Sequence, residues 1–115
     1  MRLSMTRTFI ETSAFTKRVD ASGNPALLKR IQDELLKDIT SGDLVQGTGG
    51  IRKTRIADES RGKGKRGGYR VLYLDLADRQ ETYLLAIYDK SEKDDISADE
   101  RKVLKQLVKI LKGMP

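Results

Sequence analysis

The amino-acid sequence predicts an α+β fold in which a small antiparallel β-sheet is flanked by helices. Three observations lead to this prediction: an amphipathic helix pattern in residues 25–40, a helix start signal at residues 97–100, and strand patterns in residues 69–76 and 82–88. The expected order of elements is β-α-α-β-β-β-α, with two or three helices on one face of the sheet. The 115 residues fit a single domain, 1–115, with one modest core.

The N-terminal half carries one strand pattern and two helix patterns. A short strand is expected at residues 7–11 and a short helix at residues 13–19. Asn24 followed by Pro25 favours a helix start, with asparagine as the N-cap and proline at the first helical position. The apolar residues that follow have helical spacing and predict one buried face, ending near Thr40: Leu27, Leu28, Ile31, Leu35, Leu36 and Ile39.

Three strands and a helix are expected in the C-terminal half. The strands fall at residues 51–57, 69–76 and 82–88, and a short turn at residues 77–80 joins the last two. The third of these strands is apolar on both faces, which is typical of a central position in the sheet. A capping box at Ser97 and Glu100 begins a helix that runs to Lys112 and ends at Gly113.

The composition excludes several kinds of chemistry. The chain contains no cysteine and no histidine, so disulfides, thiolate catalysis and the commonest general base are absent. No apolar run approaches the roughly 18 residues of a membrane span, and the N-terminus lacks the apolar stretch of a signal peptide. The expected location is therefore the cytoplasm. The net charge of +6 favours a polyanionic partner, and the mixed charges on the helices argue against a membrane surface.

The excess positive charge is concentrated in residues 46–70. This window holds only two acidic residues, so its net charge equals that of the whole chain. Much of it lies in the glycine-rich segment 59–68, where small residues allow backbone N–H groups and lysines to approach phosphates closely. The eight cationic residues of the window are Arg52, Lys53, Arg55, Arg61, Lys63, Lys65, Arg66 and Arg70.

Alternation along the predicted strands brings some of these cations together. Lys53 and Arg55 share one face of their strand, whereas Arg52 points the other way. Arg70 begins the next strand, and Lys90 follows the last one. If the three strands are neighbours, these cations converge near one end of the sheet, where their repulsion is relieved by a bound polyanion.

Three stretches together resemble the HigB-type toxins of the RelE superfamily: GTGGIRK, GKGKRGGYR and YLLAIYDKSEKDD. The resemblance covers about residues 44–107. It implies a compact antiparallel sheet with flanking helices, like that of microbial ribonucleases, and an endoribonuclease that cleaves messenger RNA in the ribosomal A site. It also implies a cognate antitoxin of the HigA type that contains a helix-turn-helix, through which alone the toxin would associate with operator DNA.

Carried over by position, the resemblance implies catalytic roles for Lys53, Arg55, Arg70 and Lys90. The chain departs from the family pattern at the C-terminal active-site tyrosine, where it has Ile96, which leaves Tyr88 as the candidate for part of that role. The residues implied to contact messenger or ribosomal RNA are Arg52, Arg61, Lys63, Lys65, Arg66 and Lys93. The expected reaction is attack by a ribose 2′-OH on its own 3′-phosphate, giving a 2′,3′-cyclic phosphate. No metal or cofactor is expected, since no carboxylate cluster is evident.

Two alternatives stay open at this stage. The first is a non-catalytic nucleic-acid-binding module that uses the same basic face, which predicts salt-sensitive binding without cleavage. The second is a gyrase-poisoning toxin like those of the related ParE branch, which predicts DNA damage rather than loss of messenger RNA.

Overall fold

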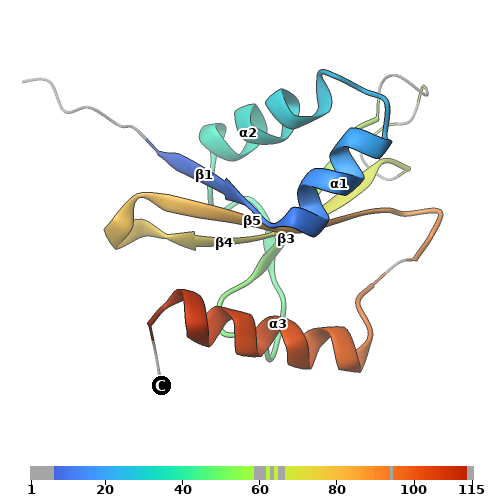
Figure 1. Ribbon diagram of the computed structural model, residues 1–115. Coiled ribbons are helices and arrows are strands. Elements are labelled where there is room, and N and C mark those ends of the chain that lie inside the picture. Colours follow the sequence, from blue (N-terminus) through green and yellow to red (C-terminus); the bar gives the residue numbers. More distant parts are fainter. Residues whose placement is uncertain (1–6, 59–61, 63, 65–66, 94, 114–115) are drawn as a thin grey trace, which may run out of the picture.

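The computed structural model describes residues 7–58, 62, 64, 67–93 and 95–113, and it confirms the α+β class (Figure 1). Four strands and three helices lie close to their predicted positions, but a two-residue strand, β2, precedes β3 and was not predicted. The elements in chain order are β1 (Thr8–Glu11), α1 (Ser13–Ala21), α2 (Leu27–Lys37), β2 (Asp43–Leu44), β3 (Arg52–Ile56), β4 (Tyr69–Leu76), the 3-10 helix η2 (Ala77–Arg79), β5 (Glu81–Asp89) and α3 (Ala98–Leu111).

The described strands form one mixed sheet in the order β1-β5-β4-β3-β2. The pairs β2–β3, β3–β4 and β4–β5 are antiparallel as expected, but β1 runs parallel to β5. The prediction of a purely antiparallel sheet was therefore wrong at this edge. Thr12 helps to fix the arrangement, because its Oγ1 donates to the carbonyl of Leu85 (2.8 Å) and also caps α1 by accepting from Phe15 N.

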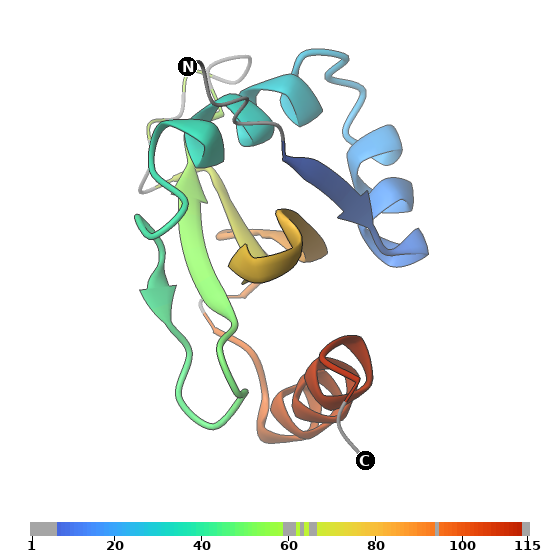
Figure 2. The same ribbon diagram turned by 90° about the vertical axis from the view of Figure 1, so that its left-hand side faces the viewer.

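The helices cover both faces of the sheet, rather than one face as predicted. Helices α1 and α2 lie on one side and α3 alone on the other (Figures 1 and 2). The reason is visible in β4, where Val71 and Tyr73 are buried against α1 and α2, while Leu72 and Leu74 are buried on the α3 side. A strand whose side chains are apolar on both faces needs a helix or another element packed against each face. The described residues therefore form two core clusters, one on each side of the sheet, instead of the single core expected.

The start of α2 differs from the sequence prediction. The helix begins at Leu27, and its N-cap position is Ala26. Asn24 instead organises the turn before it: its Oδ1 accepts from Ala26 N (3.1 Å), and its carbonyl accepts from Leu27 N (3.1 Å). The helix also ends earlier than predicted, at Lys37, because the backbone of Asp38 is extended.

The capping box of α3 is confirmed. Ser97 Oγ accepts from Glu100 N (3.1 Å), and Glu100 Oε1 accepts from Ser97 N (3.0 Å). Gly113, with a φ of +71°, follows the last turn as predicted. None of the helices in the described ranges is long and apolar enough to cross a membrane.

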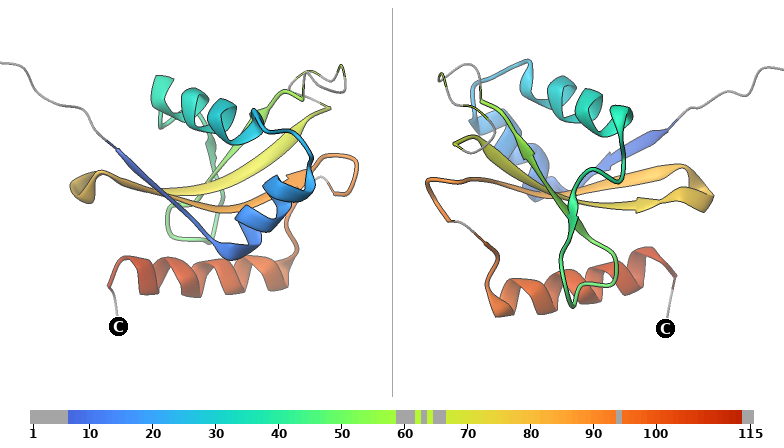
Figure 3. Two further views of the ribbon diagram at one scale, coloured as in Figure 1. Left: turned by 45° about the horizontal axis from the view of Figure 1, so that its top comes forward. Right: turned by 180° about the vertical axis from the view of Figure 1, so that it is seen from behind.

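The segment between β2 and β3 extends toward α3, as the rear view in Figure 3 shows. Arg101 donates from Nη1 to the carbonyl of Gln46, and Lys112 donates from Nζ to the carbonyl of Gly49 (2.7 Å). These bonds join the segment to both ends of α3. They fix the helix against the sheet face that carries the candidate site.

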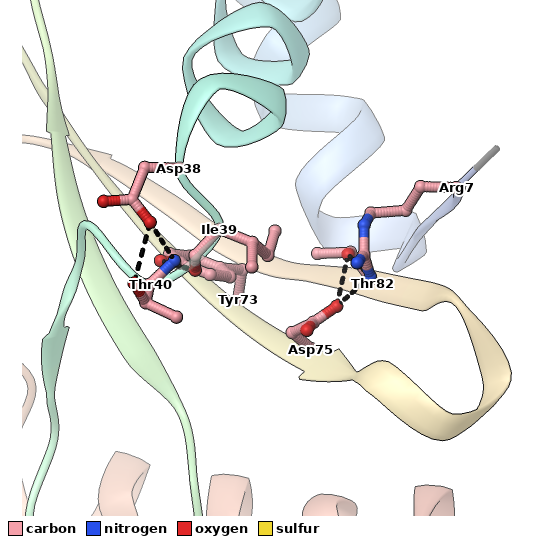
Figure 4. Close-up of polar contacts among 7 residues, drawn as sticks. All are labelled: Arg7, Asp38, Ile39, Thr40, Tyr73, Asp75 and Thr82. Atoms are coloured by element: carbon pink, nitrogen blue, oxygen red, sulfur yellow. Dashed lines mark hydrogen bonds and ion pairs between the residues drawn. The ribbon is translucent and has the colours of Figure 1, made fainter. Parts of the chain in front are cut away.

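Tyr73 holds the connection between α2 and β2 from inside the core. Its ring is fully buried, and its hydroxyl donates to the carbonyl of Ile39 (2.7 Å) and accepts from Gly42 N (3.1 Å; Figure 4). Burial raises the pKa of Tyr73. Two residues further along β4, Asp75 forms an ion pair with Arg7, and its Oδ1 also accepts from Thr82 Oγ1 (2.9 Å; Figure 4). These polar contacts connect the residue before β1 to β4 and β5.

Candidate functional site

A row of three side chains crosses the α3 face of the sheet. Arg55 of β3 is directly opposite Arg70 of β4, and Arg70 is directly opposite Tyr88 of β5. Directly paired residues on antiparallel strands project from the same face with Cβ atoms about 4.5–5.5 Å apart. The structure thus brings together three of the side chains that the sequence analysis singled out, and we call Arg55, Arg70 and Tyr88 the basic row.

Solvent access decreases along the basic row. Arg55 is exposed, whereas Arg70 and Tyr88 are each only 4% exposed. Arg70 also donates from Nη1 to the carbonyl of Tyr69 (3.3 Å). The row therefore begins in solvent at β3 and ends in the core beneath α3, so an anion that approaches it meets Arg55 first.

Lys53 lies next to the row, two positions before Arg55 on the same face of β3. Its Nζ is 3.5 Å from Oδ1 of Asp95, which belongs to the connection between β5 and α3. The pKa of Asp95 is lowered, first by the hydrogen bond from Ile96 N and further by the positive charge of Lys53. Asp95 is not among the site residues predicted from the sequence. Its only sequence signal is its place as an acidic residue in the connection that follows the strand of Tyr88.

Lys93 lies over the inner end of the row. Its Nζ is 5.0 Å from the centroid of the Tyr88 ring and 2.5 Å from Oε2 of Glu100. Contact between an ammonium and an aromatic ring at this distance is attractive. The pKa of Glu100 is lowered, mainly by the hydrogen bond from Lys93 and then by that from Ser97 N. Two carboxylates, Asp95 and Glu100, thus neutralise two of the predicted site cations.

The remaining predicted residues lie beyond the end of β5, on the opposite face of the sheet, or outside the described ranges. Lys90 is exposed just after β5, and its backbone N–H donates to the carbonyl of Gly68 (3.1 Å). Arg52 points to the opposite face, where its Nη1 donates to the carbonyls of Thr40 (3.2 Å) and Gly42 (2.7 Å). The predicted RNA contacts Arg61, Lys63, Lys65 and Arg66 all lie outside the described residues.

A hollow of about 340 Å³ opens at the outer edge of the sheet beside the exposed end of the row. Lys53 and Arg55 border it on β3, and Lys37 borders it at the end of α2. Acidic side chains from α2 and the following connection also line it, so the hollow is mixed in charge. Within the described ranges, no group of three or more His, Cys, Asp or Glu residues is placed to hold a metal ion. The cationic groups on its β3 side are the ammonium of Lys53 and the guanidinium of Arg55, which bind phosphate oxygens well.

Comparisons with known proteins agree with this architecture. A family model described as "RelE toxin of RelE / RelB toxin-antitoxin system" matches residues 7–115. Among solved structures, the chain is similar to the isolated RelE toxin of E. coli, with a TM-score of 0.52 and 16% sequence identity over 89% of this chain and 99% of that chain. At that identity, the structural likeness concerns the fold.

Proposed function

Because this chain belongs to the family of RelE toxins of RelE/RelB toxin–antitoxin systems, we propose that it is an endoribonuclease that cleaves messenger RNA in the ribosomal A site. We place it in the HigB-type branch of the superfamily, on the basis of the stretches GTGGIRK, GKGKRGGYR and YLLAIYDKSEKDD. Its proposed partners are the ribosome, messenger RNA and an antitoxin of the HigA type with a helix-turn-helix.

The observation that carries this proposal is the basic row with Lys53 beside it. Arg55 and Arg70 face each other across β3 and β4, and Lys53 shares their face. Like charges at directly opposite positions destabilise a sheet. A phosphate ester that approaches Arg55 and Lys53 offsets this repulsion, which supports a polyanionic substrate at this edge.

In the proposed reaction, the 2′-oxygen of a ribose forms a bond to the adjacent 3′-phosphorus as the bond from phosphorus to the 5′-oxygen of the next nucleotide breaks. The 2′-OH loses its proton to a general base, and the leaving 5′-oxygen gains a proton from a general acid. The products are a 2′,3′-cyclic phosphate and a free 5′-OH. Atoms and charge balance without a metal ion or a cofactor, and we propose that none takes part.

The negative charge that grows on the phosphate oxygens is the main target for stabilisation. We assign its contact to Arg55, whose guanidinium presents several donors in a fixed plane, and to Lys53. Arg70 reinforces the positive potential from a buried position, where charges act more strongly than in water. Lys53 or Lys90 transfers a proton, a step that contributes about 10²–10⁴-fold. Tyr88 supports the site through its contact with Lys93.

Orientation of the RNA by the ribosome supplies a further part of the rate in this proposal. The cations Arg61, Lys63, Lys65 and Arg66, together with Lys93, are proposed to contact the RNA backbone. Arg52 is also proposed to contact the RNA backbone, although its guanidinium donates hydrogen bonds to carbonyls of the connection between α2 and β2. These contacts would explain why a weak set of proton-transfer groups suffices.

The test is to add the purified protein to a translating extract and map the 5′ ends on a defined messenger RNA, with naked RNA in parallel. Arg55→Ala and Lys53→Ala are the informative variants because both sites are at least partly exposed; Arg70→Ala is included with a circular-dichroism check, since Arg70 is buried. Lys29→Ala, on the exposed side of α2, is the matched control.

Cuts that occur within codons, need ribosomes, persist in a chelator and disappear in the Arg55 and Lys53 variants would support the proposal. Cleavage that stops on chelation, or products with 5′-phosphates, would refute the mechanism. Intact messenger RNA with a folded protein would instead favour a non-catalytic nucleic-acid-binding module or a poison of DNA gyrase, the two alternatives that the sequence leaves open.

A further inference from the structure

A cavity of about 450 Å³ lies between the first two turns of α3 and the sheet. Its floor is formed by Leu72 of β4 and Ala86 of β5, and Leu104 of α3 contributes to the helix side. Tyr88 and Ile96 close the end nearest the basic row. The volume is within the range of about 300–1,000 Å³ that is typical of sites for small molecules.

The cavity shares two lining residues with the candidate site. Tyr88, the inner member of the basic row, lines it, and Lys93 lines it while lying over the Tyr88 ring. A strand of RNA whose phosphate contacts Arg55 and Lys53 would therefore have this cavity within reach on the same face of the sheet. Apolar walls beside a cationic edge suit a nucleobase, which is flat and weakly hydrated on its faces, attached to a charged backbone.

The carboxylates that line the cavity differ in whether they are available to accept a hydrogen bond from a base. Both carboxylates that line it, Asp99 and Glu100, come from the first turn of α3. Glu100 is already bonded to Ser97 N and to Lys93. Asp99 is exposed at the rim and is the acceptor that a ligand can reach.

We propose that this cavity binds one nucleobase of the RNA substrate and that Asp99 selects bases with an exocyclic amino group. The inference rests on the proposed function, which it deepens by assigning a base-specificity site next to the cleavage site. Adenine, cytosine and guanine each present an amino group on their pairing edge, which can donate to a carboxylate. Uracil has no amino group there, and its single N3–H donor lies between two carbonyl oxygens that repel a carboxylate. Uracil is therefore disfavoured at the position that enters the cavity.

The experiment uses the full chain with labelled methyl groups and three probes: the 3′-monophosphates of adenosine, cytidine and uridine. Methyl signals of Ala86, Ile96 and Leu104 report on the cavity, and that of Ile110, on the outer side of α3, is the internal control. Inorganic phosphate is titrated in parallel. We expect the adenosine and cytidine compounds to shift the cavity signals and to bind at least about fivefold more tightly than the uridine compound. Phosphate alone is expected to leave those signals in place.

Two variants sharpen the test. Asp99→Asn is expected to bring the three dissociation constants to within about twofold of one another, whereas Asp33→Asn on α2 leaves their ratio unchanged. Leu104→Phe is expected to fill the cavity and weaken binding of all three probes. If that variant does not fold, Asp99→Asn alone decides the question.

Binding is read without reference to cleavage, so the two proposals can fail separately. Equal affinity for the adenosine and uridine compounds, or shifts confined to signals outside the cavity, would overturn the base site even if the protein cleaves messenger RNA. Selective cavity shifts in a protein that leaves messenger RNA intact would support the base site while refuting the nuclease.

Discussion

Arg55 and Arg70 occupy directly opposite positions on β3 and β4, with Arg55 exposed to solvent and Arg70 only 4% exposed. Two cations at such a position cost stability, since cross-strand pairs contribute about 0.2–1 kcal/mol and like charges reverse the sign. A phosphate that binds the exposed Arg55 would offset part of this cost.

This arrangement predicts opposite effects of one substitution on stability and on activity. Arg55→Gln removes the repulsion, so we expect the free energy of unfolding in urea to rise by a few tenths of a kcal/mol to about 1 kcal/mol. Cleavage of messenger RNA in a translating extract should fall by at least tenfold. A variant that is both less stable and fully active would show that Arg55 packs structurally instead. Lys29→Gln should change neither quantity appreciably.

The ion pair between Lys53 and Asp95 predicts competition with the substrate. Asp95 is 58% exposed and lies 3.5 Å from Lys53 Nζ, so it must release the ammonium when a phosphate binds there. We expect Asp95→Asn to tighten binding of a single-stranded RNA by about two- to fivefold at low salt, since an exposed pair is worth about 0.2–1 kcal/mol. Fluorescence anisotropy measures this. Asp33→Asn changes the net charge equally, and an equal effect there would contradict a local role for Asp95.

Tyr73 is expected to stabilise the fold through its hydroxyl. Tyr73→Phe would leave the carbonyl of Ile39 and the N–H of Gly42 without their partner in a buried position, at a cost of about 1–3 kcal/mol. Tyr83→Phe, in the partly buried part of the same sheet, is the control and should cost less. Gly42→Ala tests the same contact, because a Cβ there would lie 2.8 Å from the Tyr73 hydroxyl oxygen. Chemical denaturation of the three variants gives the comparison.

Glu92 predicts one component of the acid sensitivity of folding. The hydrogen bond from Arg18 is the main reason that the pKa of Glu92 lies below its ordinary value of 4.5. A lowered carboxyl pKa contributes stability that is fully present above the unfolded value and is lost as the pH falls through the folded value. The wild type should exceed Glu92→Gln in stability at pH 7, by less than about 1 kcal/mol for so exposed a pair, and the difference should shrink progressively as the pH falls below 4.5. A difference that does not change as the pH is lowered would exclude this linkage.

The local elements could be predicted because their signals are local. The strand pattern placed β4 at the residues where the structure has it, and Ser97 with Glu100 located the start of α3 through a single capping box. The convergence of Lys53, Arg55 and Arg70 followed from alternation along the strands, on the condition that the strands are neighbours, which β3 and β4 are. These features depend on residues a few positions apart, whose mutual geometry is fixed by the helix or strand itself.

The missed features depend on distant pairs. The parallel pairing of β1 with β5 has no signature in either segment, and β2 is too short to show a pattern. The position of α3 on the opposite face from α1 and α2 was predictable in principle. The side chains of β4 are apolar on both faces of the strand, and such a strand needs helices on each side of the sheet. Asp95 lies beside Lys53 because of the path that the chain takes between β5 and α3. The spacing of apolar residues in the sequence gives no information about the path of such a connection.

The contact between Thr12 and Leu85 joins positions 73 apart in the chain, and it fixes β1 and α1 onto β5. Closing so long a loop costs entropy before any contact is gained, whereas the hairpin β4–β5 closes through only the four residues from Ala77 to Gln80, which contain η2. We therefore expect the hairpin in the transition state for folding and the N-terminal segment to dock after it. Thr12→Ala should then mainly speed unfolding, while Leu74→Ala should slow folding, as stopped-flow kinetics would show. On this route, the strands that bear Arg70 and Tyr88 pair before the N-terminal segment is fixed in place.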